Sequence, residues 1–479
     1  MDATVIRTGR PVYVDLDGTL IKTDLLWESL FFLARQRPAD LWRVPGWLLS
    51  GKARLKAEIA NRICFDAALL PYRDEVIDEI AAARMQGRRI VLATAANERL
   101  AHAVADHLGV FDDVMASDGE VNLSSHAKLA RIVGETDIHG FDYIGNSKDD
   151  VCLLEAAAEA TVVAPDSAAA RWQAATGANL LDGEHRSLLK PCLRAMRPHQ
   201  WMKNTLVFVP IVLTHEYLDV AMMMAGIMAF FSFSFAASAV YILNDLLDLS
   251  SDRRHKTKRN RPFASGAVPI PVGLALGVGL LVASVGLALL LNPAYQLVLA
   301  GYIAATTLYS FFLKRMLLID VLTLAALYTV RIVAGTAAAD VEGSFWLIAF
   351  SVFFFLSLAL VKRYTELIDF GTGADRATTG RGYLDADLET LGQAGMSSGF
   401  AAVMVLALYI DSTAIRELYP MPWMLWPLCP LVLYIIVRIW ILARRNQMHE
   451  DPVVFILQDW RSQIMIGAGG VMFLTAAYV

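Results

Sequence analysis

Hydrophobic and polar positions divide the chain into two unlike parts. Before about residue 185, short apolar runs alternate with amphipathic and charged segments, which is typical of a soluble α/β domain. After about residue 200, long apolar segments dominate, and most of them are long enough to cross a lipid bilayer. The pattern predicts a soluble domain at residues 1–183, a linker at residues 184–200 and a membrane domain at residues 201–479.

The apolar segments of the second part predict an all-α polytopic domain of about nine transmembrane helices. The expected spans lie near residues 201–216, 220–243, 269–291, 295–313, 318–338, 344–362, 394–411, 422–443 and 461–478. Loops rich in Lys and Arg fall on alternate turns, and cytoplasmic loops carry the excess of these residues. We therefore expect a multi-pass protein of the cell inner membrane, with the soluble domain and the basic loops on the cytoplasmic side.

Composition agrees with this division, because 56% of the residues are hydrophobic, too many for a wholly soluble protein. The start of the chain has no apolar core of signal-peptide length, so we expect the soluble domain to stay in the cytoplasm. The linker mixes basic side chains with leucines, which favours binding to an anionic membrane surface. Four scattered cysteines show no metal-site spacing, and we assign them no role.

Polar side chains follow three predicted strands of the soluble domain. The strands are expected at Val12–Val14, 88–94 and 141–146, with helical segments between them. Parallel strands of an α/β sheet place their carboxyl ends at one edge, where such proteins build their sites. The residues concerned are Asp15, Asp17, Thr94, Asn146, Asp149 and Asp150, and Lys128 lies between the second and third strands.

These residue types predict phosphoryl chemistry. A carboxylate can attack a phosphoryl group when a cation and a lysine neutralise the charge between them, and a second carboxylate can protonate the leaving oxygen. The motif DLDGT, the strand-end Thr, the Lys and the segment GNSKDD occur in the same order in the haloacid dehalogenase (HAD) superfamily of phosphatases. The soluble part resembles that family over nearly its whole length.

The resemblance implies an α/β fold with a parallel sheet and a small helical cap formed by about residues 24–72. It implies that Asp15 is the nucleophile, Asp17 the acid and base, Thr94 a donor to a phosphate oxygen and Lys128 a charge clamp. It also implies a Mg²⁺ site, formed by Asp15, Asp17, Asn146 and Asp150.

One position departs from the pattern of the family, which usually has Asp where this chain has Asn146. A neutral amide oxygen should bind Mg²⁺ more weakly, and Asp149 lies one turn away as a substitute. Two interpretations stay open: an active phosphatase, or a degenerate domain kept for structure or regulation.

The stretch from Tyr241 to Gly266 contains the strongest chemical signal of the membrane part. Asn244, Asp245, Asp248 and Asp252 recur at spacings of three and four, which places them on one face of a helix. Clustered carboxylates beside a membrane helix repel one another unless a divalent cation joins them, and Mg²⁺ favours oxygen ligands together with substrate phosphate. A basic run follows, at His255, Lys256, Lys258, Arg259 and Arg261. The alternative is an ordinary charged cytoplasmic loop.

The pattern NDxxDxxxD, followed by a basic run and RPxxxG after the second expected span, resembles the UbiA superfamily of intramembrane prenyltransferases. The resemblance covers the chain after about residue 195. It implies Mg²⁺-diphosphate binding, with catalytic and metal-binding roles for Asp245, Asp248 and Asp252 and a metal-binding role for Asn244.

The segment RPHQWMKN, with Arg197 and Lys203, resembles the start of the decaprenyl-phosphate phosphoribosyltransferases within that superfamily. The pair His255 and Lys258 and the LKR and VKRYTEL segments resemble the same branch. A charge inside an apolar span, such as Arg331, is expensive and marks a functional position. The expected substrate-binding residues are Lys203, Asn244, His255, Lys258, Arg261, Tyr309, Lys314, Arg331, Lys362 and Arg363.

In that branch the donor is phosphoribosyl diphosphate and the acceptor is a polyprenyl phosphate. The product still carries a 5-phosphate, so the HAD-like domain is expected to remove it at the cytoplasmic face.

The rival interpretations are an aromatic prenyltransferase with a prenyl diphosphate donor, a non-catalytic or regulatory HAD-like domain, and a transporter, for which no inverted repeat is evident. The partners expected are the two substrates and the membrane, with no nucleic acid. A homo-oligomer is compatible with the sequence.

Overall fold

The computed structural model describes residues 9–181, 187–215, 218–369, 382–448 and 451–478. Contacts between Cα atoms group the chain into two compact units. The first consists of residues 1–195 and 242–276, and the second of residues 196–241 and 277–479. The Asp-rich stretch, predicted as part of the membrane domain, thus packs with the soluble domain within the first unit.

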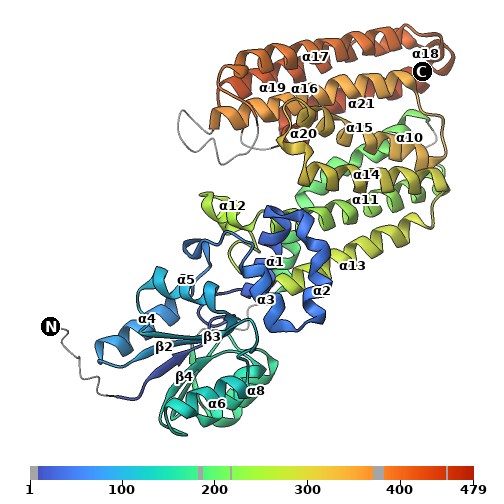
Figure 1. Ribbon diagram of the computed structural model, residues 1–479. Helices are drawn as coiled ribbons and strands as arrows, with labels where there is room; N and C mark the ends of the chain where they lie inside the picture. The colour runs from blue at the N-terminus through green and yellow to red at the C-terminus, as the bar shows by residue number, and fades with distance from the viewer. Residues whose placement is uncertain (1–8, 182–186, 216–217, 370–381, 449–450, 479) are drawn as a thin grey trace. The chain divides into compact units, whose positions relative to one another are not determined.

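The first unit contains a six-stranded, wholly parallel sheet with the strand order β3-β2-β1-β4-β5-β6 (Figure 1). Its strands are β1 (Val12–Val14), β2 (Ile90–Asn97), β3 (Asp113–Ser117), β4 (Asp142–Gly145), β5 (Glu159–Val163) and β6 (Asn179–Leu181). The order reverses at β1, which pairs with β2 on one side and β4 on the other. Such a reversal opens a crevice at the carboxyl ends of the strands, so the predicted parallel sheet is confirmed with its three polar-ended strands adjacent.

Helices cover the sheet because the central strands are apolar on both faces. All three residues of β1 are buried, as are seven of the eight residues of β2. This is the pattern of a sheet covered by helices on both sides. The covering helices are α4 (Asp74–Met85), α5 (Glu98–Leu108), α6 (His126–Glu135), α7 (Val151–Ala156) and α8 (Ser167–Thr176).

The segment between β1 and α4 is helical, as expected for a cap. It begins with α1 (Leu25–Gln36), whose first turn is capped by Asp24 Oδ1, an acceptor from the amides of Leu26 and Trp27. The remaining elements are η1 (Pro38–Arg43), α2 (Val44–Leu49), α3 (Lys52–Ala60) and η2 (Ala67–Leu69).

The second unit is helical, and α11 and α13 pass from it into the first unit. Within the described residues, six helices are long and apolar enough to cross a membrane. They are α11 (Val220–Leu247), α13 (Ile270–Ala288), α15 (Ile319–Ala339), α16 (Phe345–Asp369), α17 (Asp387–Ile410) and the segment Pro422–Arg444, which contains α19 (Leu428–Arg444). The chain is therefore a multi-pass membrane protein.

The other three expected spans behave differently from these six. Two are helices of 19 residues, α14 (Pro293–Phe311) and α21 (Trp460–Tyr478), which fall outside the set of six. The expected span at residues 201–216 is not confirmed as one α-helix. It consists of η4 (Pro198–Phe208) and the short α10 (Val209–Leu213), and it follows Arg197, whose backbone is left-handed with φ of 53°.

Candidate active sites

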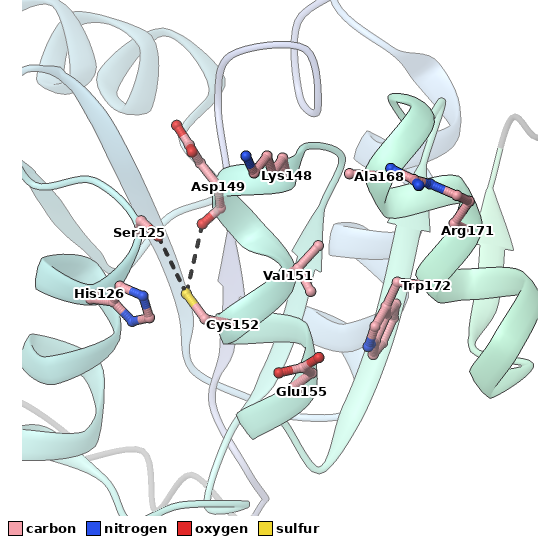
Figure 2. A pocket seen from close by; sticks show the side chains of 10 residues that line it. All are labelled: Ser125, His126, Lys148, Asp149, Val151, Cys152, Glu155, Ala168, Arg171 and Trp172. Carbon is pink, nitrogen blue, oxygen red and sulfur yellow. Dashed lines mark hydrogen bonds between the residues drawn. The ribbon is translucent and has the colours of Figure 1, made fainter.

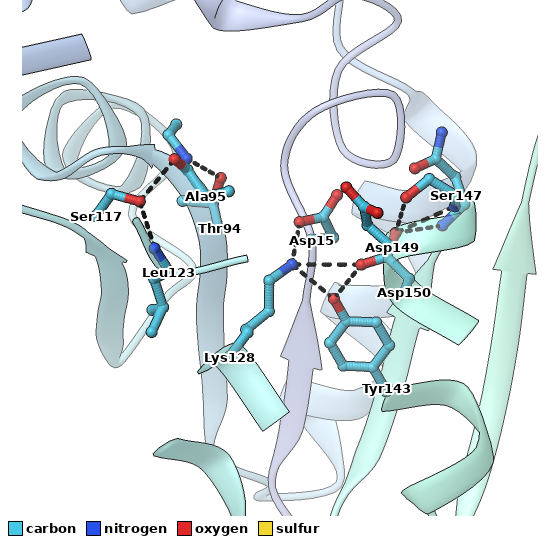
Figure 3. Close-up of polar contacts among 12 residues, drawn as sticks. Asp15, Thr94, Ala95, Ser117, Leu123, Lys128, Tyr143, Ser147, Asp149 and Asp150 are labelled. Atoms are coloured by element: carbon cyan, nitrogen blue, oxygen red, sulfur yellow. Dashed lines mark hydrogen bonds and ion pairs between the residues drawn. The ribbon is translucent and has the colours of Figure 1, made fainter. Parts of the chain in front are cut away.

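The carboxyl ends of β1, β2 and β4 bring the polar residues of the first unit together (Figure 3). Asp15 directly follows β1, and its amide donates to Ile144 O of β4. Thr94 lies within β2 and is fully buried. The segment from Asn146 to Asp150 follows β4 and forms the short helix η3 (Lys148–Asp150).

Lys128 on α6 is the centre of this group (Figure 3). Its Nζ donates to Asp15 Oδ1 at 2.7 Å and to the hydroxyl of Tyr143 at 2.9 Å, and it lies 3.3 Å from Asp150 Oδ1. The side chain is only 3% exposed. Because a buried ammonium is stable only beside opposite charge, the two carboxylates fix its position and its protonated state.

Asp150 uses both of its oxygens within the protein. The hydroxyl of Tyr143 donates to Oδ1, while Oδ2 accepts from the amides of Asn146 and Ser147 and from the Ser147 hydroxyl. Lys128 and these donors outweigh burial and hold the pKa of Asp150 below its usual range. Asp150 therefore orients Lys128, and Tyr143, which the sequence analysis did not select, completes the arrangement.

The carboxyl groups of Asp15 and Asp17 both have raised pKa values. Burial raises the pKa of Asp15 to about 7, although Lys128 opposes this. Burial, together with Asp24 and Asp15, raises the pKa of Asp17 well above its usual range. Asp17 Oδ1 accepts from the amide of Leu25 at 2.8 Å, at the first residue of α1. A carboxyl group that keeps its proton near neutral pH is suited to protonate a leaving oxygen.

The oxygens needed for Mg²⁺ are only partly arranged. Asn146 Oδ1 is buried without a hydrogen-bond partner, as an unfilled ligand position would be. Its amide packs against Gly18, where a Cβ would collide with it. Within the described residues, however, no three Asp, Glu, His or Cys side chains converge as a metal site. The residues fit one cation bound through Asp15 and Asn146, and the metal site stays a prediction.

The Asp-rich stretch is helical in almost unbroken register. α11 ends at Leu247 and α12 (Leu249–Arg254) follows, while the amides of Asp248 and Asp252 still donate to the carbonyls four residues earlier. Asp245 and Asp252 share Arg261, whose Nη1 lies 3.1 Å and 2.7 Å from them. Burial raises the pKa of Asp252 to about 6 in spite of Arg261.

Asp248 pairs with a different arginine from Asp245 and Asp252: its Oδ1 lies 3.4 Å from Arg35 of α1. The neighbouring Arg253 forms a two-pronged ion pair with Glu28 of α1, at 2.8 and 2.6 Å, and Glu28 is fully buried. The cap of the HAD-like domain and the Asp-rich segment are thus bonded to each other inside the first unit.

The second unit contains a separate buried cluster around Asp451, the N-cap of α20 (Pro452–Gln458). Its Oδ2 lies 2.7 Å from Lys203 Nζ and 3.3 Å from Lys362 Nζ, and it accepts from the Tyr328 hydroxyl at 2.8 Å. Burial opposes ionisation, but Lys203 and Lys362 hold the pKa of Asp451 far below its usual range. The sequence analysis selected both lysines and missed Asp451, which lies in a loop between two apolar spans.

Arg331 extends the positive charge of this cluster. Its Nε donates to Asn204 Oδ1 at 2.8 Å, and its guanidinium lies over the rings of Tyr302 and Tyr328. Arg331 is 5% exposed, and Asn204 is held in turn by Ser234. The described contacts of Arg331 are to neutral groups, so its charge adds to that of the lysines.

The remaining predicted substrate residues lie in other places. Arg363 is buried in an ion pair with Asp320 at 2.5 Å, and Tyr383 donates to the same carboxylate. It therefore has a structural pairing that the sequence analysis did not anticipate. His255 is half-buried, Lys258 is exposed, and Tyr309 lies on α14. Lys314 lies in the short helix η6 (Leu313–Arg315).

A hollow on the first unit lies beside η3, α7 and α8 (Figure 2). Its lining consists of Ser125, His126, Lys148, Asp149, Val151, Cys152, Glu155, Ala168, Arg171 and Trp172. Both signs of charge line it, and Asp15, Asp17 and Lys128 do not, so it is separate from the candidate phosphatase site.

Comparison with known proteins identifies the helical part. The sequence profile of the UbiA prenyltransferase family matches residues 207–461, more than half of the chain. The chain belongs to the UbiA prenyltransferase family. The profile of the haloacid dehalogenase-like hydrolases matches residues 48–169, so this UbiA protein carries an N-terminal HAD-like domain.

Three relatives illustrate the place of the chain among UbiA proteins. "Uncharacterized protein y4nM" of Sinorhizobium fredii is 38% identical, over 96% of this chain and 89% of that protein. "Nodulation protein NoeC" of Azorhizobium caulinodans is 33% identical, over 57% of this chain and 88% of that protein. "Decaprenyl-phosphate phosphoribosyltransferase" of Mycolicibacterium smegmatis is 37% identical, over 39% of this chain and 59% of that protein.

Two solved structures are similar to stretches of this chain. A UbiA homologue of Archaeoglobus fulgidus, bound to GPP and Mg²⁺, is 15% identical over 60% of this chain and 100% of its own, with a TM-score of 0.46. A protein of unknown function from Bordetella pertussis is 20% identical over 36% of this chain and 99% of its own, with a TM-score of 0.30.

Proposed function

We propose that this protein transfers a 5-phosphoribosyl group from phosphoribosyl diphosphate to a polyprenyl phosphate, and that its HAD-like domain then removes the 5-phosphate of the product. The observation that supports the transferase part is the cluster of Lys203 and Lys362 around the single carboxylate of Asp451. Arg331 lies over the ring of Tyr328, whose hydroxyl donates to the same carboxylate. Three cationic side chains against one carboxylate favour an anionic group such as a phosphate.

The acceptor chemistry follows from this charge. The polyprenyl phosphate oxygen attacks the anomeric carbon of the donor, the bond to the diphosphate breaks, and diphosphate leaves with the bonding electrons. Lys203 and Lys362 are the candidates for phosphate contacts, with Arg331 close by. Asp245 and Asp252 would hold Mg²⁺, which would neutralise the departing diphosphate, and Asp248 would join them on turning away from Arg35. Asn244 Oδ1, buried without a hydrogen-bond partner, fits as a neutral ligand of that cation.

The names of the relatives favour the phosphoribosyl branch. The mycobacterial relative is named for transfer to decaprenyl phosphate, and its match covers 39% of this chain. The match covers 59% of the length of that relative.

The phosphatase step uses Asp15, which Lys128 contacts, and Asp17, which lies two residues further along the same loop. Asp15 attacks the phosphorus, and the ribose O5 leaves with the proton of Asp17, which gives an acylphosphate on Asp15. Water then attacks the phosphorus, and Asp17 takes its proton as inorganic phosphate departs. Lys128 neutralises the negative charge beside Asp15 throughout.

We place both reactions on the cytoplasmic face of the inner membrane, where the basic loops are expected.

The test is a transfer assay with membranes that contain the full chain, Mg²⁺, a polyprenyl phosphate and phosphoribosyl diphosphate labelled in both its ribose and its 5-phosphate. We expect the ribose label to enter the lipid fraction with the wild type and not with Asp248→Ala. With Asp15→Asn, the lipid should keep the 5-phosphate label, which the wild type releases as phosphate.

Two results would contradict the proposal. If no label enters lipid while the same membranes transfer a prenyl group to an aromatic acid, the chain is an aromatic prenyltransferase. If the wild type and Asp15→Asn leave the same amount of 5-phosphate on the lipid, the HAD-like domain does not trim the product.

A further inference from the structure

The segment Pro38–Leu49 of the cap, which forms η1 and α2, has no buried residue. Half of its twelve positions are large apolar side chains, namely Leu41, Trp42, Val44, Trp47, Leu48 and Leu49. A helix of a soluble domain normally buries its apolar stripe against the core. This segment therefore presents its apolar side chains to something outside its own domain.

Exposure within the segment is high and concentrated. Trp42 is 74% exposed, Leu48 52% and Leu49 90%. The other exposed apolar side chains of the same α/β domain, such as Met85 and Ile138, stand on separate elements far apart in the sequence. Scattered apolar residues are normal on a surface, whereas a contiguous apolar group marks an interaction site.

Basic side chains surround this apolar group. Arg37, Arg43, Lys52 and Arg54 are all exposed. The nearby Asp40 is already paired, with Arg43 at 3.3 Å. The guanidinium groups of Arg43 and Arg62 lie over the rings of Trp42 and Trp47. Tryptophan and leucine at the centre with arginine and lysine at the rim match a membrane surface that contains anionic lipid.

We propose that η1 and α2 of the cap bind the surface of the bilayer, with Trp42, Leu48 and Leu49 inserted among the lipid headgroups. The occupant is the lipid bilayer, since the described part of the chain includes six helices able to span one and the cap is therefore tethered to a bilayer. The basic side chains around the apolar group have the opposite charge to anionic lipid headgroups. A membrane surface can therefore pair with them without a protein partner.

The cap would also connect the bilayer to the phosphatase site. α1 precedes η1, and its first residue, Leu25, donates an amide hydrogen bond to Asp17 Oδ1. A cap held at the headgroups would keep the loop of Asp15 and Asp17 near a phosphate carried on a lipid. This consequence rests on the proposed function, whereas the binding of the cap to lipid does not.

The test measures depth in the membrane and needs no activity. The full chain, with its four cysteines replaced by serine, is placed in nanodiscs containing anionic lipid, and a nitroxide is attached at Leu49→Cys. Met85→Cys is the matched control, since Met85 is 84% exposed on α4 of the same domain. We expect the label at Leu49 to collide more with oxygen than with a water-soluble nickel complex, and the label at Met85 to show the reverse.

Two outcomes would overturn the proposal. Equal access of the nickel complex to both labels would mean that the cap lies in water. Protection of the Leu49 label from both reagents would mean that a protein surface covers it, such as a second copy of this chain.

Two further measurements do not depend on the labelled variants. In nanodiscs with a photoreactive phospholipid, the unmodified chain should form lipid adducts in the peptide that contains residues 38–49, and several-fold fewer in the peptide that contains Met85. Equal adducts would contradict insertion. Arg37→Glu with Lys52→Glu should reduce the adducts in anionic nanodiscs and leave them unchanged in zwitterionic ones; no difference between the lipids would contradict the role of charge.

Discussion

Two clusters of this molecule combine lysine and aspartate side chains in opposite ratios. In the HAD-like domain, one lysine, Lys128, is shared by the carboxylates of Asp15 and Asp150. In the helical unit, one carboxylate, Asp451, is shared by two lysines, Lys203 and Lys362. A tyrosine hydroxyl completes each cluster.

The ratio of lysine to aspartate sets the net charge of each cluster, and the net charge determines which ligand it favours. Two carboxylates around one ammonium leave negative charge, which favours a cation and the electrophilic phosphorus it would accompany. Two ammonium groups around one carboxylate leave positive charge, which favours a phosphate oxygen. Since buried charge is stable only when it is balanced, each surplus indicates the sign of the missing ligand.

The largest effect should come from Asp15→Asn. The amide cannot act as the nucleophile, so we expect release of the 5-phosphate to fall by at least about 10³-fold. Transfer of phosphoribose to lipid should be unchanged. The measurement follows free phosphate and lipid-bound ribose in the same membranes.

Asp113→Asn is the matched control, because Asp113 is half-exposed at the start of β3 and pairs with Arg89 on the surface. It should leave both reactions unchanged. A loss of transfer in Asp15→Asn equal to its loss of phosphatase activity would show that the two clusters do not work separately.

Asp451→Asn should have the second largest effect. The substitution leaves Lys203 and Lys362 without the carboxylate that joins them, so their repulsion moves both from the position needed for phosphate. Misplacement of positioning groups by about 1 Å costs on the order of 10²-fold in rate. We expect a loss of transfer of about that size, measured as label entering lipid, while the phosphatase reaction on a soluble phosphate ester stays intact. An unchanged transfer rate would remove Asp451 from the site.

The sequence predicted one of these clusters much better than the other. Asp15 and Asp150 could be selected because a parallel sheet aligns the ends of its strands and local motifs mark each end. Asp451 could not be selected in this way, since its partners Lys203 and Lys362 come from elements far apart in the chain. Its one signal was an acid between two apolar spans, beside a proline.

The differences between expectation and structure have physical causes as well. The expected first span was read from hydropathy alone, whereas the structure has the 3-10 helix η4, which begins after the left-handed backbone of Arg197, followed directly by α10. Pro210 has no amide hydrogen to donate, and it lies in the first turn of α10, where none is needed. Arg363 was selected as a substrate-binding residue at the end of an apolar span, and that role stays a prediction. Its partner Asp320 lies on another helix, and no local pattern reveals such a pair.

A smaller effect is expected from Asn146→Asp, which adds negative charge to the first cluster. Asn146 Oδ1 already lies buried without a partner, so a carboxylate in its place should bind Mg²⁺ more tightly. We expect half-maximal phosphatase activity at a Mg²⁺ concentration lower by about tenfold, equivalent to about 1.4 kcal/mol.

Asn97→Asp is the control for this prediction. Asn97 caps α5 by accepting from the amide of Arg99, and Asp serves equally well there. The Mg²⁺ concentration for half-maximal activity should not change in Asn97→Asp. If it does not change in Asn146→Asp either, Asn146 does not contact the cation.

The smallest effect should come from Asp459→Asn, at the other end of α20 from Asp451. Asp459 pairs with one arginine, Arg438, at 2.6 and 2.9 Å, so its charge is balanced and leaves no surplus for a ligand. Arg438 holds its pKa at about 2, below the usual value, so the stabilisation is complete above about pH 4 and is lost as the pH falls through about 2. At neutral pH the substitution should lower the free energy of unfolding by about 1 kcal/mol, a shift in melting temperature of a few degrees. Transfer should stay at the wild-type rate. A loss of transfer as large as that of Asp451→Asn would mean that α20 acts through its stability, and that the lysines around Asp451 are not a binding site.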